Sequence, residues 1–452
     1  MKHIHFIGIC GISQSALAIL CKQRGYKVTG SDTCADGDVA NRLTSCGILV
    51  YQGHRAANVV GANLVVATAA IAKDNPELVA ARLAGIKVIS RAKMLGDISK
   101  GYKKVISVAG THGKTTTTGM IATIFLLAGK NPTVHIGGQL PLINGNLHIG
   151  GSEYFITEAC EYHDSFLQLK SYVSVVLNIQ KDHMDYFKTM ANLKKSFKKF
   201  ASLTSPNGYV ISNADDPKCA KLGTNRLNLT YTTNANNQAV LAAANIAADQ
   251  HNNYYYDLMV CGQNLGRVSL SVPGLHNVGN SLAAAAVALK EGISPQVIVL
   301  ALSKYTSSLR RYQFVANFCG AQVIHDYAHH PTEIAATINA TIGGGDSFNK
   351  LHIVFEPHTY SRTQYLFKEF LTCFKGADTI ILPPIYPARE QPLPGVTSEN
   401  LAKALVAKGY NAYAVDSLQA AYLKLKQIVS LGDKVLLLGA GTIENMCKMF
   451  IP

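Results

Sequence analysis

The sequence predicts three α/β domains in series, and three observations support this fold class. At 452 residues, the chain is longer than one hydrophobic core usually supports. Short β-like runs alternate with helical patterns along its whole length. Polar or basic stretches interrupt this alternation near residues 97–101 and 310–311. We therefore expect domains at 1–98, 103–310 and 311–452.

The first of these segments reads as a Rossmann-like, doubly wound unit. A strand is expected at 3–9, a helix at 14–24, and further strands at 26–31, 48–51, 63–68 and 87–90. The polar stretch at 97–101 then precedes a new apolar strand at 104–109. A domain boundary is expected there.

The second and third segments repeat the alternation. The second is expected to carry strands at 154–157, 173–179 and 209–212, an Asn-rich loop at 232–238 and an Ala-rich helix at 281–289. After Arg311, strands are expected at 322–325, 351–355, 378–382, 413–415 and 434–438. This last series predicts a second Rossmann-like domain.

The composition excludes several classes of protein. Apolar residues make up 48% of the chain and charged residues 15%, which argues against disorder. The ten cysteines form no CxxC pair, so reduced thiols are expected. The net charge of +14 is spread along the chain, which favours solvated faces, or a field that attracts an anionic substrate, over a nucleic-acid partner.

The amino-terminal apolar stretch superficially resembles a signal peptide. Gly8, Gly11, Ser13 and Gln14 interrupt it, and no small-residue cleavage site follows. No later apolar run reaches the roughly 18 residues of a membrane span. The sequence therefore predicts a cytoplasmic protein without membrane insertion.

The strongest motif lies between the strand at 104–109 and an apolar helix. It reads Gly110-Thr111-His112-Gly113-Lys114-Thr115-Thr116. Glycines let backbone N–H groups approach phosphates, Lys114 supplies a charge to the terminal phosphates, and the Thr115 hydroxyl can bind Mg²⁺. The motif therefore predicts ATP binding in a central domain like that of P-loop ATPases, although Val108 stands where the common motif has its first Gly.

Polar residues that follow two strands of the second segment are candidate metal ligands. Glu158 ends the strand at 154–157, and His183 follows the strand at 173–179. Ligands gather at such strand ends, and a hard cation takes carboxylate and hydroxyl oxygens, which Glu158 and Thr115 can supply. Each residue alone also reads as an ordinary surface acid or loop histidine.

The first segment offers a weaker phosphate-binding turn. Gly8 and Gly11 belong to a partial dinucleotide fingerprint in which Ser13 replaces the third Gly. Ser31 and Asp32 end the second strand, where they can hydrogen-bond a ribose or a base. A Rossmann turn without a ligand is the plainer interpretation.

The third segment contains two polar strings after strands. One is His325-Asp326-Tyr327-Ala328-His329-His330-Pro331-Thr332-Glu333, and the other is Glu356-Pro357-His358-Thr359-Tyr360-Ser361-Arg362. The adjacent histidines do not predict a metal site, because neighbouring side chains diverge and no third ligand is evident. The planar fork of Arg362 suits a carboxylate.

Together, these strings resemble the Mur ligases, ATP-dependent amide-bond ligases of peptidoglycan synthesis. The resemblance rests on the shortened phosphate loop, on Asn178-Ile179-Gln180-Lys181-Asp182-His183, on Pro273-Gly274-Leu275-His276-Asn277-Val278-Gly279-Asn280, and on the strings of the third segment. Segments around Glu161 and Arg389 are similar to the alanine-adding members of the family. The fold implied is three α/β domains with the substrate nucleotide on the first.

The resemblance also implies roles for individual residues. Catalytic roles would belong to Lys114, His183, His329 and Arg362, and Mg²⁺ would be held by Thr115, Glu158 and His183. ATP would contact Gly110, Thr111, His112, Gly113, Lys114, Thr115, Thr116, Asn277, Asn280, Arg311 and Asp326. UDP-N-acetylmuramate and L-alanine would contact Gly8, Gly11, Ser31, Asp32, His54, Thr68, His329 and Arg362. Thr68-Ala69 stands where the family commonly has two serines, which puts those two contacts in doubt.

The implied activity joins L-alanine to the carboxylate of UDP-N-acetylmuramate through an acyl phosphate. This reaction serves cell-wall synthesis and, through it, cell shape and division. The nearest alternative is a murein tripeptide ligase acting on the same nucleotide. A nicotinamide-dependent dehydrogenase, suggested by the first Gly-rich turn, and a nucleic-acid-binding P-loop ATPase, suggested by the net charge, are alternatives from other classes. Either a monomer or a homodimer fits the sequence.

Overall fold

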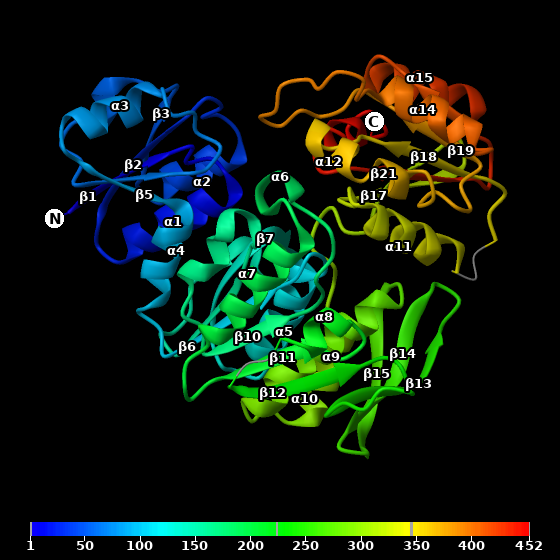
Figure 1. Cartoon of the computed structure of the whole chain (residues 1–452), viewed down its shortest axis with the longest axis horizontal. Coiled ribbons are helices and arrows are strands. Elements are labelled where there is room, and N and C mark those ends of the chain that lie inside the picture. The colour runs from blue at the N-terminus through cyan, green and yellow to red at the C-terminus, as the bar shows by residue number, and fades with distance from the viewer. Residues whose placement is uncertain (1, 223–224, 344–346, 452) are drawn as a thin grey trace.

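The computed structural model describes residues 2–222, 225–343 and 347–451, and it has three lobes that follow one another along the chain (Figure 1). Each lobe is built around one sheet. The sheets comprise residues 3–90, 104–273 and 313–438. We keep 1–98, 103–310 and 311–452 as proposed domain ranges.

The first sheet has five parallel strands in the order β3-β2-β1-β4-β5. The strands are β1 (His3–Ile7), β2 (Lys27–Asp32), β3 (Leu49–Gln52), β4 (Leu64–Ala67) and β5 (Lys87–Ser90). The helices of this domain are α1 (Ile12–Gln23), α2 (Asp38–Ser45), η1 (Ala56–Val59), α3 (Pro76–Leu83) and α4 (Arg91–Ser99). The strand order reverses at β1, so the carboxyl ends of β1 and β4 flank the crevice where such sheets bind ligands.

The second sheet has ten strands in the order β15-β14-β13-β12-β11-β10-β6-β9-β7-β8. Its parallel centre holds β6 (Lys104–Ala109), β7 (Thr133–Leu140), β9 (Tyr154–Glu158), β10 (Val173–Val176), β11 (Tyr209–Asn213), β12 (Leu227–Thr232) and β13 (Leu241–Ala248). The antiparallel edges are β8 (Gly145–His148), β14 (Asn253–Val260) and β15 (Gln263–Pro273). The sheet is therefore mixed.

Helices cover both faces of this central sheet. An apolar layer from α5 (Lys114–Leu127), α9 (His276–Lys290) and α10 (Pro295–Lys304) packs into one core cluster. Residues of η3 (Tyr162–Gln168) and α7 (Met190–Ser202) belong to the cluster on the other face. The short elements are η2 (Pro141–Ile143), α6 (Met184–Phe187) and α8 (Pro217–Ala220).

The third sheet has six strands in the order β16-β17-β21-β18-β19-β20, and only the β16–β17 pair is antiparallel. The strands are β16 (Gln313–Phe318), β17 (Ala321–Asp326), β18 (Leu351–Phe355), β19 (Thr379–Leu382), β20 (Ala412–Ala414) and β21 (Lys434–Leu438). The helices are α11 (Pro331–Ile342), α12 (Tyr360–Tyr365), α13 (Phe367–Phe370), α14 (Ser398–Ala407), α15 (Leu418–Ile428) and α16 (Glu444–Cys447).

The two junctions between lobes differ in chemistry. The first and second lobes share one apolar cluster, in which Leu17 and Met94 pack with Phe155 and Phe166. Gly96 of α4 lies so close to the Gln168 carbonyl oxygen that an added Cβ would come within 2.3 Å. Among the described residues, no apolar core cluster joins the second and third lobes. That junction depends on polar contacts.

The predicted three-domain α/β fold is confirmed, and every strand expected from the sequence is present. The sequence missed β7, β8, β12 to β16 and the antiparallel edges they form. In the described part of the chain, no helix combines the length and apolar character needed to cross a membrane.

Candidate active site

The phosphate loop turns from β6 into α5 in the conformation that its glycines permit. Gly113 precedes the helix with a φ of +84°, and a Cβ there would lie 2.5 Å from Asn280 Oδ1. Thr111 N donates to the Asn178 carbonyl oxygen, and His112 N donates to Asn178 Oδ1 at 2.8 Å. The loop is thus held against the end of β10 by one asparagine.

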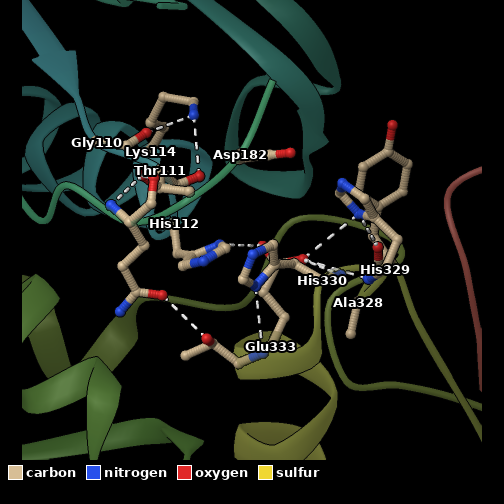
Figure 2. Close-up of polar contacts among 12 residues, drawn as sticks. Gly110, Thr111, His112, Lys114, Asp182, Ala328, His329, His330 and Glu333 are labelled. Atoms are coloured by element: carbon tan, nitrogen blue, oxygen red, sulfur yellow. Dashed lines mark hydrogen bonds and ion pairs between the residues drawn. The ribbon is translucent and has the colours of Figure 1, made fainter. Parts of the chain in front are cut away.

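Lys114 pairs with a buried acid that sequence reasoning gave no role. Its Nζ donates to Glu161 Oε2 at 3.0 Å and to the Thr111 carbonyl oxygen at 3.1 Å, and Figure 2 shows the contacts with the loop. Glu161 is 1% exposed. Burial alone would lower the pKa of Lys114, but Glu161 outweighs it and raises the pKa. The lysine therefore carries its charge beside the loop.

Thr115 and Glu158 lie next to Gly137 and Gly138, two adjacent glycines of β7. Gly137 N donates to Glu158 Oε1 at 2.6 Å, and a Cβ on Gly138 would lie 3.0 Å from Thr115 Cγ2. The absence of side chains on this pair leaves space beside the Thr115 side chain and the Glu158 carboxylate. These oxygen donors fit Mg²⁺, which takes few protein ligands and completes its shell with water and phosphate oxygens. Among the described residues, no group of three His, Cys, Asp or Glu side chains gathers to hold a metal.

His183 precedes α6 and has a left-handed backbone conformation, with a φ of +54°. Its ring stacks on Tyr162 with a centroid distance of 4.4 Å. Its Nε2 atom lies 3.7 Å from Glu161 Oε1 and 3.6 Å from Asp182 Oδ2. The structure thus places His183 beside these two acids.

A cavity of about 790 Å³ opens beside the loop, between the second and third lobes. Seven of the predicted ATP contacts line it: His112, Gly113, Thr116, Asn277, Asn280, Arg311 and Asp326. Gly110, Thr111, Lys114 and Thr115 form the rest of the adjoining loop and helix start. The predicted nucleotide residues are therefore brought together.

Buried hydrogen bonds fix the cavity walls. Asn280 Nδ2 donates to Asn277 Oδ1 at 3.0 Å, and Asn277 Nδ2 donates to the Pro273 carbonyl oxygen at 2.7 Å. Asp326 accepts from the backbone N–H groups of Tyr312 and Ala328 at 2.7 Å each. Burial raises the pKa of Asp326 to about 6, against the opposing effect of Arg311.

Glu333, at the start of α11, connects the third lobe to the phosphate loop (Figure 2). Its Oε1 atom lies 3.0 Å from His112 Nδ1, and its Oε2 atom accepts from His329 N at 3.2 Å. Burial would raise the pKa of Glu333, but His329 and His112 outweigh it and hold the pKa well below its usual range. The acid therefore stays ionised at the junction.

Of the two predicted amino-acid residues, Arg362 lines a separate, smaller cavity of about 120 Å³ where the third lobe meets the second, and His329 is not among the residues that line it. Arg362 Nε donates to Asp182 Oδ1 at 3.2 Å, across the junction, and both residues line this cavity. His329 Nδ1 lies 2.9 Å from the Tyr327 carbonyl oxygen, and burial lowers the pKa of His329 to about 4. Its imidazole is therefore neutral at pH 7.

The predicted nucleotide-sugar residues gather at one end of the first sheet. Gly8 N donates to the Ser31 carbonyl oxygen at 2.8 Å, Gly11 precedes α1, and Cys10 N donates to Asp32 Oδ2 at 2.9 Å. Thr68 follows β4 and lies near Gly8.

The side chains of Ser31 and His54 both contact the buried acid Glu77. The Ser31 hydroxyl donates to Glu77 Oε2 at 2.5 Å, and His54 Nδ1 lies 3.4 Å from the same oxygen. Both Ser31 and Glu77 are fully buried. Ser31 therefore supports this end of the sheet through Glu77, and its hydroxyl faces the protein interior.

Family models describe three consecutive parts of the chain. The model of the Mur ligase family, catalytic domain, matches residues 3–103. The Mur ligase middle domain matches residues 108–288, and the Mur ligase, glutamate ligase domain, matches residues 310–441. The chain belongs to the Mur ligase family. It is an ATP-dependent ligase.

Individual relatives of this Mur ligase match it along its whole length. The UDP-N-acetylmuramate–L-alanine ligase of Acetivibrio thermocellus is 40% identical over 452 residues, covering 100% of this chain and 96% of the relative. That of Clostridium perfringens is 41% identical, covering 100% and 98%. The crystal structure of UDP-N-acetylmuramate-alanine ligase from Thermotoga maritima has a TM-score of 0.83 at 26% identity, covering 100% and 98%.

A murein peptide ligase from Psychrobacter arcticus shares the fold of this Mur ligase, with a TM-score of 0.76 at 23% identity and coverage of 100% and 98%. Sequence reasoning on this Mur ligase gave no role to four acids: Glu77, Glu161 and Asp182, which are buried, and Glu333, whose side chain is 13% exposed. Glu161, Asp182 and Glu333 lie within sequence strings already singled out. An acidic residue in the same string as a proposed Lys, Arg or His ligand could therefore have indicated their place in the site. Glu77 gave no such signal, because its partners are distant in sequence.

Proposed function

We propose that this Mur ligase joins L-alanine to the carboxylate of UDP-N-acetylmuramate, with cleavage of ATP, in peptidoglycan precursor synthesis. The observation that carries the proposal is the convergence of two cationic residues on the His183 segment. Lys114 of the phosphate loop pairs with Glu161, and Arg362 of the third lobe pairs with Asp182. Both acids lie within 4 Å of His183, so a phosphate and an amino-acid carboxylate would be bound side by side.

The proposed reaction takes place in two steps. A muramoyl carboxylate oxygen attacks the γ-phosphorus of ATP, the bond to the β–γ bridging oxygen breaks, and ADP leaves. The amine of L-alanine then attacks the acyl carbon, inorganic phosphate leaves, and the amine gives up a proton. Lys114 stabilises the charge on the phosphates, and alignment of the reactants supplies much of the rate enhancement.

The proposed site residues divide by ligand. For ATP we propose the loop Gly110 to Thr116 with Asn277, Asn280, Arg311 and Asp326, and for Mg²⁺ Thr115, Glu158 and His183. Mg²⁺ would add charge neutralisation at the phosphates. For the nucleotide-sugar we propose Gly8, Gly11, Asp32, His54 and Thr68, with Ser31 acting through its backbone and Glu77. For L-alanine we propose His329 and Arg362.

The reaction is proposed to take place in the cytoplasm with small-molecule substrates. It requires neither nucleic acid nor insertion into a membrane, and a monomer or a homodimer can carry it out.

The test is phosphate release from ATP with two substrate pairs. We expect turnover with UDP-N-acetylmuramate plus L-alanine, and little with the same nucleotide plus murein tripeptide. Faster phosphate release with the tripeptide would instead assign this protein to the murein peptide ligases. Lack of ATP turnover with both pairs would exclude both assignments.

A further inference from the structure

An ion pair joins the second and third lobes at the smaller cavity. Arg362 Nε donates to Asp182 Oδ1 at 3.2 Å, and Arg362 Nη2 reaches Asp182 Oδ2 only at 3.5 Å. Both side chains are 10% exposed. Arg362 therefore provides the Asp182 carboxylate with a cationic partner that is itself largely buried.

The two carboxylate oxygens of Asp182 differ in the hydrogen bonds that they accept. Oδ1 accepts from Arg362 Nε and from His183 N at 2.8 Å. Within the described part of the chain, Oδ2 has only the 3.5 Å contact with Arg362 and a 3.6 Å approach from His183 Nε2. Contacts of that length are at or beyond the limit of a hydrogen bond. A charged, largely buried oxygen thus keeps acceptor capacity next to the cavity.

The other two acids that line the cavity of about 120 Å³ each accept a short hydrogen bond from a hydroxyl group. Asp185 Oδ2 accepts from the Tyr162 hydroxyl at 2.7 Å. Glu390 accepts from both Ser361 N and the Ser361 hydroxyl. Among the described residues that line this cavity, Asp182 is the acid that combines a salt bridge to Arg362 with an oxygen that has only long contacts.

Charge balance points to the kind of ligand that fits. Arg362 next to Asp182 is a neutral pair, which gains little from a ligand that carries only a carboxylate. An α-amino acid presents both charges on adjacent carbons, so it can offer its carboxylate to the guanidinium and its ammonium to Asp182. Charge-assisted hydrogen bonds would form at both ends.

On the basis of the proposed function, we propose that Asp182 binds the α-ammonium group of the amino-acid substrate while Arg362 binds its carboxylate. The backbone contact from His183 N fixes the Asp182 carboxylate, and His183 lies between Asp182 and Glu161. Glu161 holds Lys114 of the phosphate loop. The amine is thus placed towards the phosphate end of the site before it attacks.

The experiment compares L-alanine with propionate, which has the same carbon skeleton and carboxylate but no ammonium. The KM for L-alanine and the inhibition constant of propionate against L-alanine are measured with saturating ATP and UDP-N-acetylmuramate. The variants are Asp182→Asn and, as a matched control, Glu369→Gln. Glu369 pairs with Lys181 across the same junction, 3.4 Å away, but does not line the cavity.

In the wild type, propionate should bind at least about tenfold more weakly than L-alanine binds. Asp182→Asn should raise the KM for L-alanine about tenfold or more and leave the inhibition constant of propionate unchanged or lower, because the repelling acid is gone. Glu369→Gln should change neither constant. An unchanged KM for ATP would show that the variant site is folded.

Parallel weakening of L-alanine and propionate in Asp182→Asn would mean that Asp182 only supports the structure, and it would overturn the proposal. Equal binding of the two ligands by the wild type would overturn it without any variant. Failure of the proposed function gives a different result, because the wild type would then release no phosphate with L-alanine.

Discussion

At the scale of single residues, buried acids organise this protein. Glu77 is fully buried at the end of the first sheet, where it accepts from Ser31 and Asn58 and lies 3.5 Å from His5. Burial alone would raise its pKa, but these neighbours outweigh it and lower the pKa to about 2. Such an acid stabilises the fold only while it is ionised.

Glu77→Gln should therefore destabilise the protein at pH 7 by at most roughly 3 kcal/mol. Because the pKa is lowered on folding, this contribution is complete above the unfolded value of 4.5 and is lost as the pH falls towards 2. Urea unfolding between pH 7 and pH 2.5 should show the variant's deficit shrinking in that window. The exposed neighbour Asp74→Asn is the control, and an equal, pH-independent loss in both variants would contradict the argument.

At the scale of elements, the strand–loop–helix from β6 to α5 depends on Gly113. Its φ is +84°, and a Cβ would come within 2.5 Å of Asn280 Oδ1. Gly129, just beyond the other end of α5, has a φ of +70° with open space around it. Alanine substitutions at these two glycines therefore separate the effect of backbone strain from the effect of the contact with Asn280.

Gly113→Ala and Gly129→Ala should each cost about 1–2 kcal/mol of stability from the left-handed backbone alone. Only Gly113→Ala should also weaken ADP binding, by about tenfold or more, since Asn280 must move from the nucleotide cavity wall. Thermal melts with and without ADP, together with calorimetric titration, measure both effects. Full ADP affinity in Gly113→Ala would contradict the steric argument.

The elements also show what the sequence could predict. Buried parallel strands such as β6, β10 and β21 are short and mostly apolar, so composition and length were enough to find them. Strand β13, Leu-Ala-Ala-Ala-Asn-Ile-Ala-Ala, has a helix-like composition and becomes a strand through pairing with β12 and β14. The candidate site was predictable where one string carries it, as in Gly110–Thr116, whereas the Glu161–Lys114 and Asp182–Arg362 pairs depend on tertiary folding.

At the scale of the whole molecule, the two junctions should respond differently to perturbation. The first and second lobes share an apolar core, but the second and third meet through His112–Glu333, Asp182–Arg362 and related polar contacts. Charged contacts weaken with salt more than buried apolar contacts do. The third lobe is therefore the one expected to move.

Glu333→Gln tests this directly, because it removes the charge that faces His112 and His329. Loss of a hydrogen bond to a charged group costs about 1.5–3 kcal/mol, so the KM for ATP should rise roughly ten- to a hundredfold. Small-angle scattering should show a larger radius of gyration at low salt, approaching that of the wild type at high salt. Asp257→Asn, which removes a pair with Arg267 confined to β14 and β15, should change neither quantity. Unchanged scattering and KM in Glu333→Gln would show that the junction does not depend on this acid.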